Sequence, residues 1–160
     1  QAHIYIVGDL AGRPSLASTA TELGRMAVRH AFLGEVGQSG ALLPMAIYTI
    51  PELSYVGETE RQLLERKADY ARGYAPYANT ARGQIIGNEH GLLKLLVDRQ
   101  SRLILGVHII GESASELVHV GQMAMTCSAT VDVLAATVFN YPTLAQCYKM
   151  AALEVLMQLG

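Results

Sequence analysis

The chain is organised around one stretch near its C-terminal end, which reads Phe139-Asn140-Tyr141-Pro142-Thr143-Leu144-Ala145-Gln146-Cys147-Tyr148. Proline sterically disfavours the α region for the residue before it, so we expect extended backbone at Tyr141. From Thr143 to Gln146 the pattern matches a capping box, in which a threonine caps a helix and a glutamine reaches back to it. The stretch therefore predicts a helix whose entry turn presents Asn140 and Tyr141.

The predicted helix has one apolar face. Its members recur at the helical period: Leu144, Tyr148, Ala152, Val155 and Leu159. A helix that docks by such a face holds its entry turn at a fixed place. The residues alone favour Tyr141 as an amphipathic interface residue with a satisfied hydroxyl over a role in a site.

The same stretch resembles the C-terminal signature of the flavoprotein disulfide reductases, which include lipoamide dehydrogenase and glutathione reductase. In that family a His precedes the proline and a Glu follows it four residues later, whereas here Tyr141 and Gln146 hold these positions. The variant Phe-Asn-Tyr-Pro-Thr, followed by a Tyr and an Ala-Ala-Leu, is similar to one branch, the soluble pyridine nucleotide transhydrogenases. This resemblance makes Tyr141 and Pro142 candidates for the active-site wall that faces the partner subunit's flavin.

The two substitutions have a chemical consequence. A His–Glu pair moves protons near neutral pH when a dithiol is oxidised or reduced. A tyrosine, with a reference pKa of about 10, and an amide that does not ionise cannot replace that pair. An enzyme that passes hydride between two nicotinamides through a flavin has no thiol to protonate. Tyr141 and Gln146 therefore favour the transhydrogenase branch.

The N-terminal part predicts a strand at residues 3–7, which Gly8-Asp9 ends, and a helix from Ser15 to about Leu33. Ser15 after a proline is the expected N-cap, and Gly24 inside the helix suggests close packing. An aspartate at a strand end is more often a turn or cap residue than a ligand.

Residues 4–9 and 14–18 are together similar to the second FAD motif of the same family. The resemblance implies that Asp9 binds the ribityl chain of FAD. It also implies that the helix start faces the flavin's pyrimidine edge, through Ser15, Leu16, Ala17 and Ser18. A helix N-terminus suits that task because it offers free N–H groups and a positive dipole.

The remaining chain predicts a linker at 34–44 and then a succession of strands and short helices. The expected strands are 46–49, 53–56, 69–76, 92–97 and 103–110, with Ile85-Ile86 at the start or end of another. The strands 92–97 and 103–110 should pair as a hairpin, and their near-continuous apolar character implies cover on both faces. Gly106 suggests a bulge or a close backbone approach.

Two further capping boxes mark helix starts. Thr59 to Gln62 opens a helix that runs to about Lys67, and Ser113 to Glu116 opens one that runs to about Thr126. A shorter helix follows at 131–136. Together with the resemblance, these elements predict an α+β fold: residues 1–43 form the strand–helix tail of an FAD-binding domain and a linker, and 44–160 form an antiparallel sheet with helices, the dimerisation domain.

Composition limits the partners. The net charge is −2 and no basic run occurs, which argues against nucleic acid and anionic membranes. No secretory signal or membrane-length apolar run is present, so a cytoplasmic location is expected. Only 16% of residues are charged, which suggests that apolar surface serves an interface.

Other candidate chemistry is weak. Cys127 and Cys147 form no Cys-x-x-Cys motif and are expected to be buried free thiols. Glu116 and His119 share one helical face, which is half of a di-metal signature without its second copy. We therefore predict no metal site and no nucleophile.

The sequence contains no Gly-x-Gly-x-x-Gly motif, and Gln1 stands almost inside a predicted strand. We expect the C-terminal part of a longer FAD enzyme that exchanges hydride between NADPH and NAD⁺ as a two-fold homodimer, with the isolated part inactive. Two alternatives stay open: a dihydrolipoamide or disulfide reductase, and a non-enzymatic dimerisation module.

Overall fold

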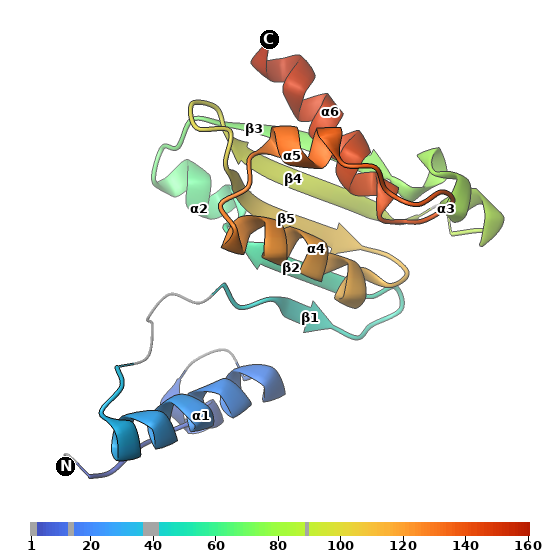
Figure 1. Cartoon of the computed structure of the whole chain (residues 1–160). Coiled ribbons are helices and arrows are strands. Elements are labelled where there is room, and N and C mark those ends of the chain that lie inside the picture. Colours follow the sequence, from blue (N-terminus) through green and yellow to red (C-terminus); the bar gives the residue numbers. More distant parts are fainter. Residues whose placement is uncertain (1–2, 13–14, 37–41, 89) are drawn as a thin grey trace. The chain divides into compact units, whose positions relative to one another are not determined.

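The computed structural model describes residues 3–12, 15–36, 42–88 and 90–160. The chain divides into two compact units, Gln1–Leu43 and Pro44–Gly160, which Figure 1 shows in blue and in cyan to red. The first unit contains the 3₁₀ turn η1 (Gly8–Ala11) and the helix α1 (Ala17–Leu33). The second contains all the strands of the described residues.

The strand expected at residues 3–7 is not formed. Residues 4–7 have no regular structure, and the described part of this unit offers no second strand for them to pair with. A strand depends on ladder hydrogen bonds to a neighbour, which is why the alternating pattern alone was insufficient. Ile4 and Ile6 are 61% and 59% exposed. The Tyr5 hydroxyl lies 2.7 Å from Nδ1 of His30 on α1.

The close packing predicted around Gly24 is wrong for this chain. A Cβ atom built at Gly24 would meet nothing within 4 Å. The outer surface of α1 is also apolar, because Val28, Phe32 and Leu33 are all more than half exposed. The first unit therefore leaves several of its apolar side chains exposed.

The second unit is built on a five-stranded antiparallel sheet with the strand order β1-β2-β5-β4-β3. The strands are β1 (Met45–Ile47), β2 (Leu53–Gly57), β3 (Tyr70–Pro76), β4 (Leu92–Asp98) and β5 (Ile104–Ile110). The predicted hairpin is confirmed as β4–β5. The Asp98 carboxylate holds its turn by accepting hydrogen bonds from the main-chain N–H groups of Gln100 and Ser101.

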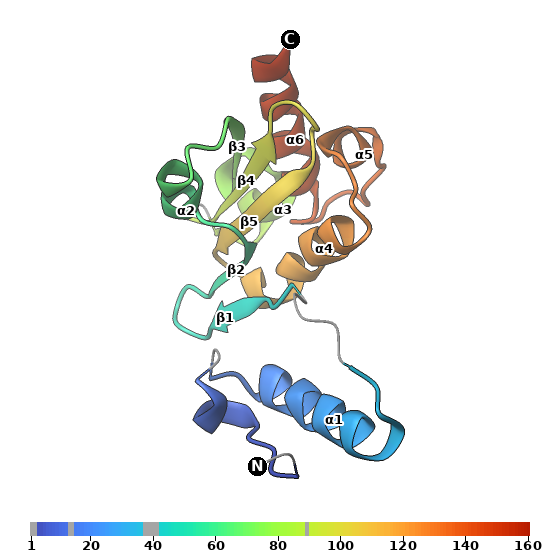
Figure 2. The same cartoon turned by 90° about the vertical axis from the view of Figure 1, so that its left-hand side faces the viewer.

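Three helices cover one face of the sheet, as Figure 2 shows: α4 (Ala114–Thr126), α5 (Val131–Ala136) and α6 (Gln146–Leu159). Leu93, Leu95 and Val107 point toward this side and are fully buried. The short helix α2 (Glu60–Glu65) lies on the other side. The core thus sits between the sheet and the helices α4 and α6, which gives the predicted α+β architecture.

Gly106 lies at a close backbone approach and next to a register shift, as predicted. A Cβ atom there would stand 2.2 Å from the main-chain oxygen of Glu58, so only glycine admits this approach. The β4–β5 register also shifts between Leu96 and Val97, close to Gly106 in the pairing.

Ile85 and Ile86 do not belong to a strand. Ile85 ends the helix α3 (Ala81–Ile85), which follows the 3₁₀ turn η2 (Tyr77–Asn79). The Thr80 side chain caps α3 by accepting a 2.9 Å hydrogen bond from the main-chain N–H of Gly83. This cap overrides the β preference of the two isoleucines.

The two central capping boxes have opposite outcomes. The Thr59–Gln62 box is confirmed on α2, with both reciprocal bonds present. The box at Ser113 is wrong, because Ser113 has a φ of 58° and makes no cap bond. Instead the Glu52 carboxylate accepts bonds from Ser115 N (3.0 Å) and Oγ (2.7 Å), and these bonds lower its pKa.

Among the described residues, no helix has the length and hydropathy needed to cross a bilayer.

Candidate functional site

The stretch before α6 forms an exposed turn. Tyr141 is 72% exposed, and the Tyr141–Pro142 peptide bond is cis. The Thr143 hydroxyl donates a 2.7 Å hydrogen bond to the Asn140 carbonyl and closes the turn. The predicted presentation of Asn140 and Tyr141 at the helix entry is therefore confirmed.

The capping box predicted for this helix is wrong. The helix α6 begins at Gln146, and its N-cap is Ala145, which provides no side-chain bond. Thr143 lies two residues before this N-cap, and its hydroxyl donates to the Asn140 carbonyl within the turn. Gln146 is consequently released from a capping role and lines a surface hollow instead.

The predicted apolar face of α6 packs into the core and fixes the position of the turn. Tyr148 is fully buried, and its hydroxyl donates to the Leu117 carbonyl at 2.7 Å while it accepts from Gly121 N at 3.0 Å. Burial raises the pKa of Tyr148, so this phenol stays protonated and acts structurally. The Phe139 ring stacks on Tyr148 at a centroid distance of 6.5 Å.

A hollow of about 330 Å³ lies beside the turn. Its lining comes from the turn and α6: Val138, Phe139, Gln146, Lys149, Met150 and Leu153. The exposed apolar side chains of the same elements include Val138 at 90% and Met157 at 78%. These fractions are large for apolar groups, which identifies the turn and α6 as a candidate interface.

The two cysteines differ. Cys147 is fully buried at the start of α6, and burial raises its pKa to about 12. Cys127 was expected to be buried but is exposed, because it occupies the C-cap of α4, where the helix leaves the sheet. Both are free thiols.

The second set of candidate residues lies in the first unit. Asp9 is exposed in η1, and its main-chain carbonyl accepts a bond from Gly12 N. Ser15, Ala17 and Ser18 are exposed and Leu16 is half-buried. The N-cap of α1 is the extended Leu16, which makes no side-chain cap bond, so the prediction of Ser15 as N-cap is wrong. In the part of the chain that the structure describes, the N-cap residue therefore offers no side-chain partner to the first-turn N–H groups of α1.

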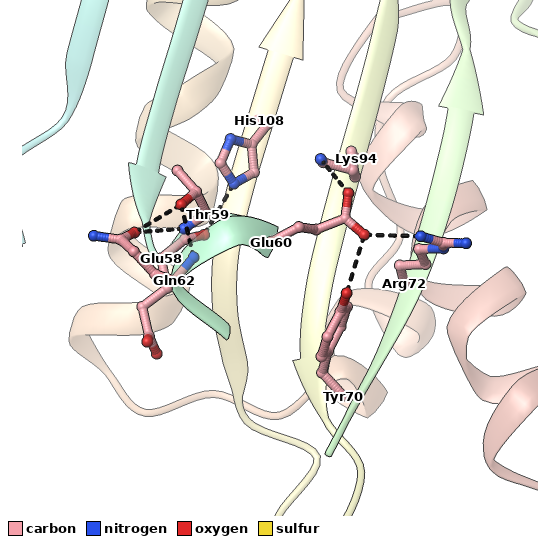
Figure 3. A network of polar contacts seen from close by, with 8 residues as sticks. All are labelled: Glu58, Thr59, Glu60, Gln62, Tyr70, Arg72, Lys94 and His108. Carbon is pink, nitrogen blue, oxygen red and sulfur yellow. Dashed lines mark hydrogen bonds and ion pairs between the residues drawn. The ribbon is translucent and has the colours of Figure 1, made fainter. Parts of the chain in front are cut away.

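A polar network that the sequence reading missed lies on the α2 side of the sheet (Figure 3). The Glu60 carboxylate accepts bonds from Lys94 Nζ and Arg72 Nη1, both at 2.9 Å, and from the Tyr70 hydroxyl at 3.3 Å. The bond from Lys94 is the main cause that lowers the Glu60 pKa to about 2. The available signal was the interruption of two apolar strands by Lys94 and His108.

The network also corrects the expectation of cover on both faces of β4 and β5. Lys94 and His108 stay partly exposed, and Ile110 is 37% exposed. The described residues contain no cluster of three or more His, Cys, Asp or Glu side chains that could hold a metal ion.

The sequence of residues 43–152 matches the family model described as the pyridine nucleotide-disulphide oxidoreductase dimerisation domain. The chain belongs to this family. The match confirms the resemblance drawn from the Tyr141 turn, and the observed sheet with its helices is the architecture expected for the domain.

Two relatives carry the same name. The chain is 50% identical over 154 residues to the soluble pyridine nucleotide transhydrogenase of Mycobacterium bovis (strain BCG / Pasteur 1173P2), covering 96% of this chain and 33% of the relative. It is 44% identical over 163 residues to that of Escherichia coli (strain SMS-3-5 / SECEC), covering 99% and 35%. The chain thus spans about a third of the length of these relatives.

Solved structures of the family are also similar. The HOCl-induced flavoprotein disulfide reductase RclA from Escherichia coli aligns with a TM-score of 0.86 and 26% identity, over 95% of this chain and 35% of that one. LpdA from Mycobacterium tuberculosis aligns with a TM-score of 0.85 and 30% identity, over 93% and 33%.

Proposed function

We propose that this chain supplies the dimerisation domain and part of the flavin site of an FAD-dependent enzyme that exchanges hydride between NADPH and NAD⁺. The observation that carries the proposal is the Tyr141 turn, where a phenol and the amide of Gln146 replace the imidazole and carboxylate of the disulfide reductases. The names of the 44% and 50% identical relatives support the same reaction.

The first unit has groups that fit a flavin. The Asp9 carboxylate is exposed, and within the described residues the N-cap Leu16 gives α1 no side-chain cap, so both sites can meet a ligand. Asp9 would accept hydrogen bonds from ribityl hydroxyls, and the start of α1, from Ser15 to Ser18, would donate N–H groups to the pyrimidine edge. Bound FAD would supply the hydride-carrying chemistry that protein side chains lack.

The second unit has a surface that fits a second copy of the chain. Val138, Leu153 and Met157 are apolar and at least 46% exposed beside the Tyr141 turn. An isologous two-fold contact through them would cover this surface in both copies. Tyr141 and Pro142 would then wall the partner's flavin and exclude water. A cytoplasmic location accords with relatives that are named soluble.

A disulfide reductase is the second candidate, and the name of the RclA neighbour favours it. Such an enzyme needs a proton shuttle beside its thiols, which Tyr141 and Gln146 do not provide. A non-enzymatic dimerisation module is the third candidate, since the dimerisation-domain match by itself requires no catalysis.

The deciding experiment uses the longer protein that contains this chain. It is purified, its visible spectrum is recorded, and it is mixed with NADPH and thio-NAD⁺ in the absence of any disulfide. A flavin spectrum with reduction of thio-NAD⁺ is expected. A flavin protein that turns over only with a disulfide would establish the reductase, and a colourless protein would leave the dimerisation module.

Two variants separate the flavin site from the interface. Asp9→Ala should retain flavin more weakly, by tenfold or more, whereas the matched control Glu22→Gln on α1 should not. Met157→Glu should weaken the dimer in light scattering, whereas Leu64→Glu, an exposed apolar position on α2, should leave it intact. Unchanged flavin retention in Asp9→Ala would refute the assignment of Asp9.

A further inference from the structure

The face of the sheet opposite α4 and α6 carries a row of four side chains. In the observed register Tyr74 pairs with Lys94, Lys94 with His108, and His108 with Tyr55. The row therefore crosses β3, β4, β5 and β2 on one face, because paired residues point to the same side of a sheet. None of these residues takes part in the proposed flavin site or in the interface on α6.

The row borders a hollow of about 260 Å³. Apolar groups complete the lining, chiefly Leu53, Leu92 and Ile110. The Tyr55 ring stacks on His108 with a centroid distance of 5.7 Å and an interplanar angle of 9°. The hollow thus has a flat aromatic side and an apolar floor. Its volume lies below the roughly 300–1,000 Å³ that is typical of sites for larger ligands, so it suits a ligand with a single ring.

The row contains both a hydrogen-bond acceptor and hydrogen-bond donors. His108 Nε2 lies 3.0 Å from the Glu58 carbonyl, which only accepts, so Nε2 carries the proton. Burial lowers the pKa of His108, so the ring is neutral at pH 7 and Nδ1 is a bare acceptor. Figure 3 shows this second nitrogen on the side of the ring away from Glu58.

The donors are Lys94, Tyr55 and Tyr74. Lys94 Nζ gives one of its three hydrogens to Glu60, which leaves two. The hydroxyls of Tyr55 and Tyr74 bond to no group in the described part of the chain.

The charge around the row is positive. Glu60 is one carboxylate that faces two cations, Lys94 and Arg72. An anionic group placed beside Lys94 would therefore meet a net positive charge. A second copy of the same face is a poor occupant, because it would bring four cations against two carboxylates.

We propose that this hollow binds a small aromatic carboxylate that also carries a ring hydroxyl. The carboxylate accepts hydrogen bonds from Lys94 and the tyrosine hydroxyls, the ring lies against the apolar floor, and the ring hydroxyl donates to His108 Nδ1. The polar pattern favours a ligand with both ends. One without the anion leaves the two remaining Lys94 hydrogens and the tyrosine hydroxyls without an acceptor from the ligand, and one without the hydroxyl leaves Nδ1 without a donor.

The test titrates the longer protein that contains this chain with 4-hydroxybenzoate and with benzoate in a calorimeter. The protein should bind 4-hydroxybenzoate more tightly than benzoate. Lys94→Met should weaken the binding of 4-hydroxybenzoate by about tenfold or more, because the variant loses a charge-assisted hydrogen bond to the carboxylate. Arg61→Met removes an exposed positive charge from the same side of the sheet and should have no effect. His108→Phe keeps a ring against Tyr55 and should abolish the preference for the hydroxyl.

Several outcomes would overturn the proposal: no binding at millimolar ligand, equal binding of both ligands, or equal loss in Lys94→Met and Arg61→Met. If a variant fails to fold by circular dichroism, the ¹⁵N resonance of His108 Nδ1 in the unmodified longer protein decides. It should shift with 4-hydroxybenzoate and stay fixed with benzoate, and a resonance that does not move refutes the site. Self-association that Lys94→Met abolishes would assign this face to a protein contact instead.

Discussion

The two faces of the same sheet meet their neighbours in opposite ways. On the α6 face the contact is so close that a Cβ at Gly73 would stand 2.0 Å from the Ala151 carbonyl oxygen. On the other face Tyr74, one residue further along β3, borders a partly open hollow beside Lys94. One step along a strand therefore exchanges a dry packing contact for a polar surface.

The α6 face contributes mainly to stability, whereas the other face has groups that can bind a ligand. On the α6 face Leu95 and Val107 are fully buried, so these side chains contact other protein atoms and no water. Those on the other face keep unused donors and acceptors, which a ligand can satisfy. Substitutions should therefore cost the most free energy of unfolding on the α6 face and progressively less toward the open rim.

The largest effect is expected for Gly73→Ala. The new methyl would collide with backbone, which cannot rotate away, so we expect a loss of about 3 kcal/mol or more in the free energy of unfolding. Urea unfolding followed by circular dichroism measures it. Gly24→Ala is the control, because nothing lies within 4 Å there and helical alanine should be neutral or favourable. If Gly73→Ala and Gly24→Ala both change the free energy of unfolding only slightly, the close contact on the α6 face contributes little to stability.

Tyr148→Phe should cost about 2 kcal/mol, because the buried Gly121 N–H and the Leu117 carbonyl both lose a hydrogen-bond partner. Tyr48→Phe, at a 79% exposed position, should change stability by less than about 0.5 kcal/mol. Thermal unfolding of both variants provides the measurement. A loss as small as that of Tyr48→Phe would show that the hydroxyl does not hold α6 to α4.

Glu60→Gln tests the other face, and its effect depends on pH. The folded pKa of Glu60 is about 2 against an ordinary 4.5, so the network stabilises the protein above pH 4.5 and loses this effect as the pH falls toward 2. The side chain is 24% exposed, so after solvent screening we expect a cost of about 1 to 2 kcal/mol at pH 7.

Urea unfolding of both proteins at pH 7 and pH 3 checks this. The difference between Glu60→Gln and the unmodified chain should shrink at pH 3. The exposed Glu65→Gln serves as the matched control and should show little change at either pH. A difference that grows on acidification would contradict the sign of the linkage.

The smallest effect is expected at the open rim. Arg61 and Glu65 form an exposed ion pair on α2, with the Arg61 side chain 87% exposed. Arg61→Met should change the free energy of unfolding by less than about 0.5 kcal/mol, and high salt should remove even that change. If Arg61→Met lowers the free energy of unfolding as much as Glu60→Gln does, the exposure of a side chain does not predict the cost of its substitution.

Much of the fold was predictable because it depends on near neighbours in the chain. The β4–β5 hairpin follows from two apolar runs around a polar turn, and the α2 cap follows from Thr59 and Gln62, three residues apart. The Tyr141 turn was likewise anticipated as exposed and placed before a docked helix. The roles of Asp9 and of residues Ser15–Ser18 stay predictions.

The failures have different causes, and each concerns the partner that a residue finds. Thr143 and Ser113 fit the capping pattern, but Thr143 bonds to Asn140, and the α4 start is capped by Glu52, 63 residues from Ser115. Residues 3–7 have a strand pattern, but the described part of their unit contains no strand that could pair with them. Local patterns state what a residue is able to do, whereas the choice among its possible partners depends on residues that the pattern does not include.

The sequence by itself determined most of the element types, the helical faces and the family signature, because these follow from side-chain chemistry repeated over short distances. Apart from the β4–β5 hairpin, only the tertiary structure decided which strands are neighbours. That order brings Tyr55, His108, Lys94 and Tyr74 into one row, although they come from four strands. Strand alternation places each of them on a face, but only the hydrogen-bonded register between strands sets them side by side.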